Sequence, residues 1–461
     1  MNTGTRKIAE RAPTLDRAPG PRFLTPFGFL AVLRRDALGC LMAWTREYGD
    51  VVDVRFPPFR NFLVTHPSGV QHILQTNHRN YWKGAVFGKL KRIAGEGLVF
   101  SDGELWRRQR RLIQPAFHRQ RIELLAGMMT DRTLAMLEGW ERRAATAEPF
   151  DVAAEMSRLT LDIVGRALFG TDLGADEEEF RGAVAGGLAY ANHLLNHFLT
   201  PPLFVPTAAN RRGRRAIRSL DRIVWQIIER HRRAGENGDD LLGMLLAARD
   251  ADTDRAMDDG QLRDEVVTFL VAGHETTAVA LAWTWYLLAT HEDVESRLAG
   301  EIAEVLEGRL PALPDLPRLR YTRMVLEESM RLYPPAWAVS RQSFADDEVR
   351  GVRLPAGTVV TLSPYVTHRN PDFWEAPERF DPERFSPERS AGRPEYAYFP
   401  FGGGPRGCVG NQFAMLEAQL VLATVAQKFR LHAVPGHVVE PDPILTLRPR
   451  YGIRVMLERR A

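Results

Sequence analysis

The most apolar segment of the chain, Val266–Thr290 (VVTFLVAGHETTAVALAWTWYLLAT), is long enough to cross a lipid bilayer. His274 and Glu275 lie near its middle, however, and a charged side chain at that depth is costly in lipid. A helix inside a folded core can satisfy such groups with protein partners. The pattern therefore favours a buried core helix over a membrane span.

Helical periodicity extends over much of the remaining chain. It dominates from Ser101 to about Leu246 and recurs at Tyr321–Leu332 and at Asn411–Phe429. The second of these segments stops before Pro334, because the residue preceding a proline disfavours the helical conformation. Helices are thus the main expected element.

Strand patterns are fewer and shorter. Asp50–Thr65 alternates polar and apolar residues around a Pro-Pro pair, which predicts a hairpin. Short strands are also expected within Val349–His368 and near the C-terminal end, within Thr446–Arg460. Together these patterns predict a mainly α protein with a minor β-rich portion.

At 461 residues and 44% apolar content, the chain has the composition of a soluble globular protein. It contains two cysteines, Cys40 and Cys408, so we expect no disulfide framework and a reducing compartment, the cytoplasm. Five of the 61 basic residues are lysine, an arginine bias typical of a GC-rich genome rather than of nucleic-acid binding. The polar N-terminus predicts neither a signal peptide nor a membrane anchor.

Cys408 lies in an unusual frame of glycines, FPFGGGPRGCVGNQFA, over Phe399–Ala414. A turn-rich surface loop, a phosphate-binding loop and a buried structural cysteine are three alternatives for it. A phosphate loop would continue as G-K-[ST], and a structural cysteine needs no glycine frame. Glycines let the backbone approach closely, and the helix expected after the cysteine presents its positive end to sulfur, so both features favour a thiolate.

A thiolate held in this way can be a nucleophile or a metal ligand. A nucleophile would need a base, and the spacing of histidine and asparagine identifies no partner for it. One cysteine is too few for zinc or an iron–sulfur cluster unless distant ligands join it. One thiolate does suffice as the axial ligand of haem, because the porphyrin supplies the other four donors.

Phe401, Gly404, Arg406, Cys408 and Gly410 match the haem-binding signature F-x-x-G-x-R-x-C-x-G, and in this respect the chain resembles the cytochrome P450 family. The resemblance implies haem b as cofactor, with Cys408 as the axial metal ligand of its iron. It also implies that Phe401 packs beside the cysteine, that the glycine N–H groups tune the sulfur, and that Arg406 pairs with a haem propionate.

A second motif, Ala272–Thr277 (AGHETT), lies in the middle of the long apolar segment. Glycine and threonine in a helix can form a simple packing notch, since hydroxyls bond back to carbonyls one turn earlier. An acid beside a hydroxyl in apolar surroundings is instead typical of proton delivery. The motif is similar to A-G-x-[DE]-T-[TS] of the same family, which implies that Thr276 and Glu275 are catalytic and that Ala272 faces the haem. His274, at the variable position, is expected to be packed or hydrogen-bonded rather than an iron ligand.

The third motif is Glu328-x-x-Arg331. Alone it says little, because i, i+3 ion pairs occur on many exposed helices. In an otherwise apolar helix, a buried pair with further partners is plausible. The resemblance implies that an arginine of an F-x-P-E-R-F segment joins it, here Arg384; an earlier P-E-R-F offers Arg379 as the alternative. These residues are expected to be structural.

The fourth motif is Trp106-x-x-x-Arg110, within a run rich in arginine. A solvated basic helix face is the alternative explanation. The two residues are one turn apart and can face the same carboxylate. The resemblance implies that this carboxylate is a haem propionate and that Arg341 supplies a further, less specific contact. Arginines on the other faces, Arg107, Arg108 and Arg111, then suit an acidic redox partner.

Substrate contacts are implied less directly. The segment after the third motif passes over the haem in the family, which nominates Ala336 and Ala338. The loop over Trp82–Phe100, rich in apolar residues, is expected to cap the pocket. An apolar pocket indicates an apolar substrate.

The resemblance runs from about Pro21 to the last strand. It implies the cytochrome P450 fold, with a long central helix over the haem, as one catalytic domain over residues 21–461 after a flexible segment, 1–20. It also implies a soluble haem-thiolate monooxygenase that inserts one oxygen atom of O2 into a hydrophobic small molecule, such as a terpenoid of secondary metabolism. Fatty acids and xenobiotics are alternative substrates.

Separate ferredoxin and ferredoxin reductase proteins are the electron donors that the resemblance implies. Two alternatives to an O2-dependent monooxygenase are a peroxide-driven enzyme and a haem-thiolate sensor or electron carrier. The first usually replaces the acid–threonine pair in the family, and the second would not need it.

Overall fold

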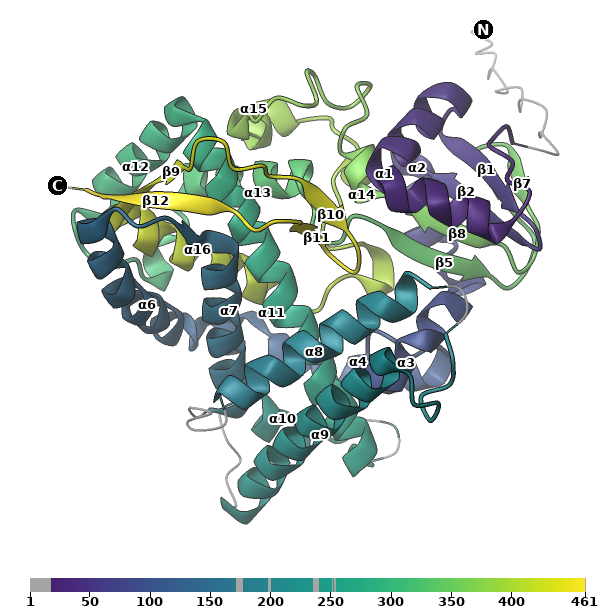
Figure 1. The fold of residues 1–461 in the computed structure, drawn as a ribbon, viewed down its shortest axis with the longest axis horizontal. Helices are drawn as coiled ribbons and strands as arrows, with labels where there is room; N and C mark the ends of the chain where they lie inside the picture. The colour runs from purple at the N-terminus through teal and green to yellow at the C-terminus, as the bar shows by residue number, and fades with distance from the viewer. Residues whose placement is uncertain are drawn as a thin grey trace, which may run out of the picture.

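The computed structural model describes residues 18–460 apart from 171–176, 198–199, 235–239, 251 and 253. Helices form most of the molecule, and the largest sheet lies to one side (Figure 1). The helices are α1 (Pro26–Tyr48), α2 (Pro67–Gln71), α3 (Lys91–Ala94), α4 (Gly103–Ile113), α5 (Arg119–Glu123), α6 (Ala126–Thr146), α7 (Val152–Phe169), α8 (Glu177–Leu195), α9 (Ala208–Ala234), α10 (Leu241–Ala247), α11 (Asp259–Thr290), α12 (Glu292–Leu306), α13 (Arg320–Leu332), α14 (Pro364–Thr367), α15 (Pro387–Ser390) and α16 (Asn411–Lys428). The strands are β1 (Val51–Phe56), β2 (Phe59–Val64), β3 (Tyr81–Trp82), β4 (Phe150–Asp151), β5 (Val339–Ser343), β6 (Asp347–Val349), β7 (Val352–Leu354), β8 (Val359–Leu362), β9 (Phe429–Ala433), β10 (Pro441–Pro443), β11 (Leu447–Pro449) and β12 (Arg454–Arg459).

This architecture confirms the mainly α fold class and the elements predicted from periodicity. The expected hairpin is β1–β2, in which Phe56 pairs with Phe59 across the Pro57-Pro58 turn. Helix α13 ends at Leu332, two residues before Pro334, and α16 ends one residue earlier than predicted.

The largest sheet has the strand order β1-β2-β8-β5-β3. Its strands β5 and β8 follow most of the helices in the sequence. Strand β8 joins β2 in parallel, with Val64 beside Leu362, and β5 pairs antiparallel with β8. This arrangement carries Arg341, in the middle of β5, to the helical part of the molecule. Its effect is to place a buried cation next to the site described below.

The N-terminal segment was expected to be flexible over residues 1–20, of which residues 1–17 lie outside the described part of the chain. Residues 18–20 do not fit that expectation. Ala18 is buried, and the carbonyl of Pro19 accepts a hydrogen bond of 2.9 Å from the N–H of Asp53 on β1. Residues 18–20 therefore belong to the packed part of the chain.

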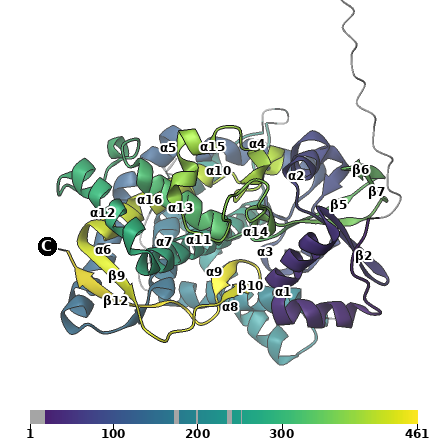
Figure 2. The ribbon, with the colours of Figure 1, turned by 90° about the horizontal axis from the view of Figure 1, so that it is seen from above.

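Helix α11 is the central element of the fold. It starts where the Asp258 side chain accepts a hydrogen bond from the N–H of Gln261, as an N-cap does. It packs against α7, α13 and α16, and it lies between α16 and α8 when seen from above (Figure 2). Although α11 is apolar and long enough to span a membrane, 72% of its apolar window is buried inside the protein, as a core helix should be.

A buried ion-pair network holds α13 to the segment that precedes the Cys408 loop. Arg331 binds both carboxylate oxygens of Glu328, at 2.6 and 2.9 Å, and both side chains are fully buried. The Arg331 guanidinium also donates to backbone carbonyls, those of His368, Pro377 and Arg379. Arg384 lies 3.3 Å from Glu328, which confirms it as the third member, whereas Arg379 contributes a carbonyl.

We predict that Arg331→Met destabilises the protein by about 3–5 kcal/mol, because the buried Glu328 loses its main counter-charge and three backbone carbonyls lose their donor. Arg323→Met on the same helix is the matched control. Its partner is Glu327, its side chain is 61% exposed, and its loss should cost less than about 1 kcal/mol. Urea unfolding followed by circular dichroism measures both. Similar losses of unfolding free energy in the two variants would contradict a stabilising role for the buried network.

Candidate active site

The loop that carries Cys408 is shaped by close backbone contacts. The N–H of Cys408 donates to the carbonyl of Phe401 at 2.9 Å, just before α16 begins. Gly404 has a φ of +60°, and a β-carbon there would lie 1.9 Å from the carbonyl oxygen of Leu74. Its own N–H donates to the hydroxyl of Tyr396 at 3.1 Å. Gly404 therefore fixes the path of the loop. Its N–H is directed at Tyr396, whereas the resemblance had implied that it is directed at the sulfur.

Cys408 faces an internal cavity of about 410 Å³. Its side chain is exposed to that cavity, although the loop lies deep in the protein. Burial raises the pKa of the Cys408 thiol, and the Gly410 N–H and the Arg110 charge oppose this shift only in part. The glycine frame therefore does not produce a thiolate by itself, contrary to the expectation from the sequence. A metal ion bound to the sulfur would produce one.

Apart from the exposed Arg121, the cationic side chains that line the same cavity are four: Lys83, Arg110, Arg341 and Arg406. Burial lowers the pKa of each, well below the ordinary value for Lys83 and to about 10 for Arg341. The carboxylate of Asp102 offsets this for three of them, all except Arg110. Buried positive charges with so little compensation suit an anionic ligand.

The indole of Trp106 helps to orient this group of cations. The Arg406 guanidinium lies over the ring at 4.3 Å and binds Asp102 at 2.6 Å and the carbonyl of Ser101 at 3.0 Å. Arg110, one helical turn after Trp106, donates to the carbonyl of Gly407 at 2.9 Å, next to the cysteine. The α4 motif and the cysteine loop are therefore joined directly, and both face the cavity.

The donor set fits a b-type haem. Among the described residues that line the cavity, Cys408 is the only Cys, His, Asp or Glu, so it is the anionic protein ligand available there to a metal ion. A haem would supply the remaining donors to its iron through the porphyrin, and two carboxylates to the surrounding cations.

Helix α11 supplies another wall of the cavity, through Ala272 and Thr276. The Thr276 hydroxyl donates to the carbonyl of Ala272 at 2.7 Å, so its oxygen lone pairs remain free to accept a hydrogen bond from the cavity. Gly273 lets α7 approach closely, since a β-carbon there would lie 3.0 Å from Val164. The motif thus combines a packing notch with a hydroxyl that faces the cavity.

Glu275 points away from the cavity and does not hydrogen-bond to Thr276 within the described structure. Its carboxylate accepts a hydrogen bond of 3.0 Å from the hydroxyl of Thr446 and lies 4.0 Å from Arg448, whose side chain is 38% exposed. His274 is buried and shares a hydrogen bond of 3.2 Å with Ser157 on α7, as expected for a packed side chain. Glu275 therefore connects α11 to the partly exposed C-terminal hairpin β10–β11.

The predicted site residues thus fall into two groups. Those that line the cavity are Cys408, Arg406, Phe401, Gly410, Trp106, Arg110, Arg341, Ala272 and Thr276. Gly404 and Glu275 lie behind it. Of the substrate contacts, Ala336 lines the cavity but Ala338 does not, because Val339 at the start of β5 takes its place.

Several cavity residues carried no clear signal in the sequence. Lys83 lies within the predicted capping segment, but nothing marks it as a buried cation. Thr268 lies eight residues before Thr276, on the same helical face, so its position could have been found from helical periodicity. Outside the cavity lining, Glu417 on α16 also carried no signal: it is fully buried, and burial raises its pKa well above its ordinary value, with the Thr277 hydroxyl opposing in part.

The arginines expected to meet a redox partner are engaged within the chain. Arg107 pairs with Glu104, and Arg108 donates to the carbonyl of Ala256 at 2.8 Å. Arg111 pairs with Asp250 and with the exposed Asp252, at 3.0 and 2.8 Å. An acidic partner at this surface would therefore compete with intramolecular carboxylates.

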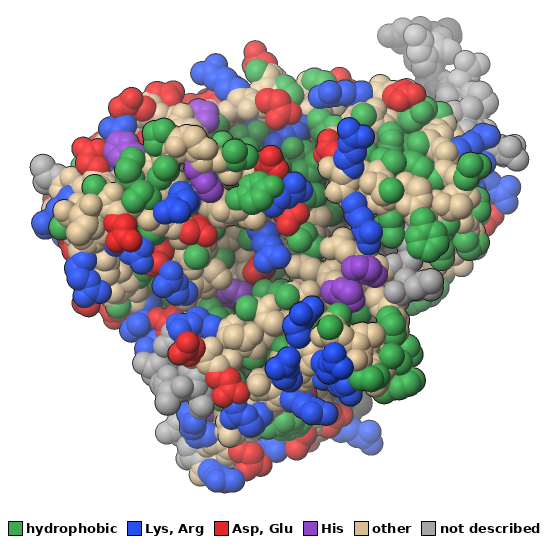
Figure 3. Space-filling view, viewed as in Figure 1, with side chains coloured by type: hydrophobic (Ala, Val, Ile, Leu, Met, Phe, Trp, Pro, Cys, Tyr) green, Lys and Arg blue, Asp and Glu red, His purple; other side chains and the backbone are tan. Residues whose placement is uncertain are grey.

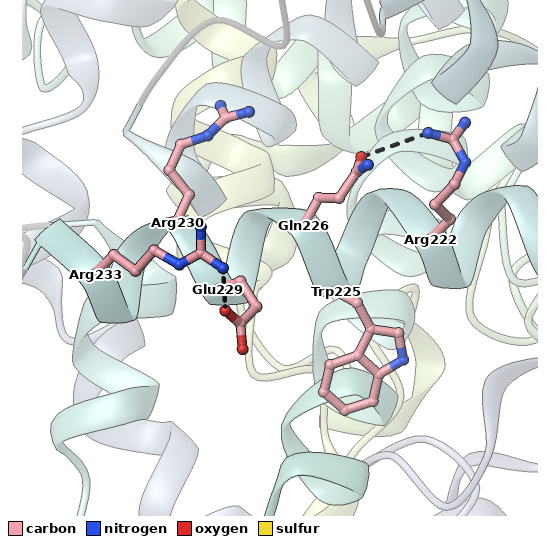
Figure 4. A pocket seen from close by; sticks show the side chains of 6 residues that line it. All are labelled: Arg222, Trp225, Gln226, Glu229, Arg230 and Arg233. Atoms are coloured by element: carbon pink, nitrogen blue, oxygen red, sulfur yellow. Dashed lines mark hydrogen bonds and ion pairs between the residues drawn. The ribbon is translucent and has the colours of Figure 1, made fainter.

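A second hollow, of about 500 Å³, is an open groove along α9 (Figure 4). It is lined by Arg222, Trp225, Gln226, Glu229, Arg230 and Arg233. These residues come from one helix, and Arg233 pairs with Glu229 at 2.9 Å. Lys and Arg side chains also gather over this part of the surface (Figure 3). The groove is a charged surface feature without the enclosing walls of the Cys408 cavity.

A mainly helical fold, in which one thiol faces a cavity ringed by cations and walled by a long central helix, defines a haem-thiolate protein. The family model described as Cytochrome P450 matches residues 18–456. The chain is 40% identical over 430 residues to cyclooctat-9-en-7-ol 5-monooxygenase of Streptomyces melanosporofaciens, covering 93% of this chain and 92% of that protein. It is 36% identical over 424 residues to pentalenene oxygenase of Streptomyces avermitilis, covering 91% and 92%.

The structure agrees with these sequence comparisons. The heme domain of cytochrome P450DA superposes with a TM-score of 0.87 and 28% identity, over 96% of this chain and 98% of that one. The chain belongs to the cytochrome P450 family. It is a cytochrome P450 monooxygenase with a b-type haem as its cofactor.

A buried carboxylate beside the cavity leads to a prediction about the pH dependence of stability. Glu265 on α11 is fully buried, and its carboxylate accepts a hydrogen bond of 2.9 Å from the N–H of Leu98. Burial raises the pKa of Glu265 from 4.5 to about 8, because the Leu98 N–H offsets only part of the lost hydration. Between these two pH values the folded state binds a proton that the unfolded state has released. Stability from the neutral acid is therefore complete below about pH 4.5 and is lost as pH rises toward 8.

We predict that Glu265→Gln flattens the pH profile of stability, since the amide keeps the acceptor for Leu98 but cannot ionise. The free energy of unfolding of the wild type, relative to that of the variant, should fall by up to about 1.4 kcal/mol per pH unit between pH 5 and 7. Urea unfolding of the haem-loaded proteins at pH 5, 6 and 7 measures this difference. A difference that stays constant over that range would show that Glu265 ionises normally.

Proposed function

We propose that this P450 oxidises a cyclic terpenoid of secondary metabolism, with electrons from a separate ferredoxin and its reductase. The observation that carries the proposal is the largely apolar wall of the cavity, which favours a hydrocarbon-rich substrate. This wall includes Leu98, Val99, Leu241, Met244 and Phe269. Named relatives that match over about nine-tenths of the chain are terpenoid monooxygenases, which supports the same class.

Cys408 is the residue that would ligate the haem iron, and the cations on the cavity wall would bind the propionates. Arg406 and Arg110 are held beside the cysteine loop by Trp106 and by the carbonyl of Gly407. Arg341 reaches the same cavity from β5, and its buried charge has little compensation within the protein. When bound, the haem supplies dioxygen activation and the insertion of one oxygen atom into a C–H bond.

Thr276 would position a hydrogen-bond donor in the cavity. Its own proton is committed to the carbonyl of Ala272, so it offers the cavity an acceptor. Glu275 would then take up protons from the surface side, where Arg448 is partly exposed. Because Glu275 does not touch Thr276, a proton from it would reach the cavity through intervening water.

The retained acid and threonine favour an O2-dependent monooxygenase over a peroxide-driven enzyme. A peroxide-driven enzyme receives oxygen that is already reduced and protonated, so it needs no proton delivery. A sensor or electron carrier needs no cavity for an apolar substrate. We place the catalytic domain from about Ala18, where the family match begins, and the protein in the cytoplasm.

Thr276→Ala should uncouple the enzyme, because it removes the acceptor that positions protons in the cavity. We expect the product formed per NADPH consumed to fall by about tenfold, while NADPH consumption continues. Turnover of a terpene that the wild type oxidises, with surrogate ferredoxin and reductase, measures this ratio.

Thr284→Ala is the matched control. Thr284 is a fully buried threonine on the same helix, and it also donates to a carbonyl four residues earlier, but it does not line the cavity. Its loss should leave the coupling ratio within about twofold of the wild type. An unchanged product yield in Thr276→Ala would overturn the role assigned to Thr276.

A further inference from the structure

Thr268 differs from the other threonines of α11. Four of the five threonine hydroxyls on this helix donate to the carbonyl four residues earlier. They are those of Thr276 at 2.7 Å, Thr277 at 3.0 Å, Thr284 at 2.8 Å and Thr290 at 2.9 Å. The hydroxyl oxygen of Thr268 has no hydrogen-bond partner among the residues that the structure describes, although the residue is only 2% exposed.

A short segment that crosses α11 places the Thr268 hydroxyl in this unusual setting. This crossing segment, residues 95–98, is tied to the helix by hydrogen bonds from Glu96 N–H to Asp264, 2.7 Å, and from Leu98 N–H to Glu265, 2.9 Å. At Gly97 the two backbones come so close that a β-carbon would lie 2.1 Å from the Thr268 hydroxyl oxygen. The hydroxyl is therefore held where the crossing segment and α11 meet at the cavity wall.

An unpaired buried hydroxyl is costly. Leaving such a group without a partner costs about 1–3 kcal/mol, and valine has almost the same shape without that cost. Packing alone would therefore favour valine at position 268. The hydroxyl is explained if its partner is a group that enters the cavity, since Thr268 is one of the residues lining it.

The surroundings of Thr268 make its hydroxyl selective. The neighbouring cavity walls are apolar and include Leu98, Val99, Leu241, Met244 and Phe269. In such a pocket a hydrocarbon leaves the hydroxyl unpaired, whereas a ligand with its own hydroxyl satisfies it. Sites built to bind a ligand hydroxyl discriminate strongly against the analogue that lacks it.

We propose that Thr268 binds a hydroxyl group of the substrate, so that the enzyme acts on a terpenoid alcohol and produces a more highly oxygenated product. This inference rests on the proposed terpenoid monooxygenase function and specifies its substrate class. Thr268 precedes Thr276 by eight residues, which is about 12 Å along the helix axis. The bound hydroxyl and the oxidised carbon therefore lie toward opposite ends of the substrate.

The place of the enzyme in a reaction sequence follows from this chemistry. The substrate must come from a reaction that leaves a hydroxyl on a cyclic hydrocarbon, either cyclisation ended by water or an earlier hydroxylation. This enzyme would then add oxygen at a carbon remote from that hydroxyl.

The test compares the binding of paired probes to the haem-loaded protein by the spin-state shift of the ferric haem. The pairs are ent-kaurene with ent-kaurenol and bornane with borneol, each of which differs by one hydroxyl group. The wild type should bind the alcohol of at least one pair about tenfold more tightly than the hydrocarbon, which corresponds to about 1.4 kcal/mol. Absence of any alcohol preference in the wild type would overturn the proposal.

Three variants identify the residue responsible. Thr268→Val should weaken alcohol binding about tenfold and leave hydrocarbon binding within about twofold, whereas Thr268→Ser should keep the preference. Thr284 is a buried threonine that does not line the cavity, so Thr284→Val should change neither alcohol binding nor hydrocarbon binding. An alcohol preference that survives in Thr268→Val would overturn the proposal. That result is expected if bound water already satisfies the Thr268 hydroxyl.

The same preparations separate this inference from the proposed function. The carbon-monoxide spectrum and the product yield with each probe are recorded for the wild type. Oxidation of both members of a pair without an alcohol preference would contradict the role of Thr268 alone. A protein that carries its haem and oxidises no terpene, alcohol or hydrocarbon, would contradict the proposed function.

Discussion

The structure depends on one constraint, which is that a single thiol must face an internal cavity among buried positive charges. Burial disfavours both the thiolate and the cations, as the raised pKa of Cys408 and the lowered pKa of Arg341 show. Neither is well compensated by the protein itself. A haem relieves both, because its iron binds the sulfur and its carboxylates bind the cations. The protein is thus built around a charge arrangement that its cofactor completes.

The rest of the fold keeps this arrangement rigid. The Glu328–Arg331 pair anchors the chain that leads into the cysteine loop, and Gly404 lets that loop lie directly against the backbone of Leu74. Helix α11 closes the cavity with a face that changes along its length, from Thr268 under the crossing segment 95–98 to Thr276 two turns later. The electronic properties of the metal and the choice of substrate are therefore set by different elements, which can vary separately.

Much of the fold and the centre of the site could be predicted from sequence because their signals are local. The spacing around Cys408 and the apolar pattern of α11 each depend on neighbouring residues. What the sequence did not reveal depends on distant contacts. Gly404 packs against the backbone of Leu74, Glu275 accepts a hydrogen bond from Thr446, and Thr268, where Gly97 crosses the helix, has no hydrogen-bond partner among the described residues. No periodicity or motif contains that information, since each contact joins separate parts of the chain.

The central claim is that Cys408 is the axial ligand of a haem in this cavity. The carbon-monoxide spectrum of the reduced protein tests it most directly, with Cys408→His as the comparison. The account predicts that the wild type shows the red-shifted Soret band of a thiolate-ligated haem and that Cys408→His retains haem but shows the band of a histidine-ligated one. A wild-type spectrum without the thiolate band, or a thiolate band that persists in Cys408→His, would contradict it.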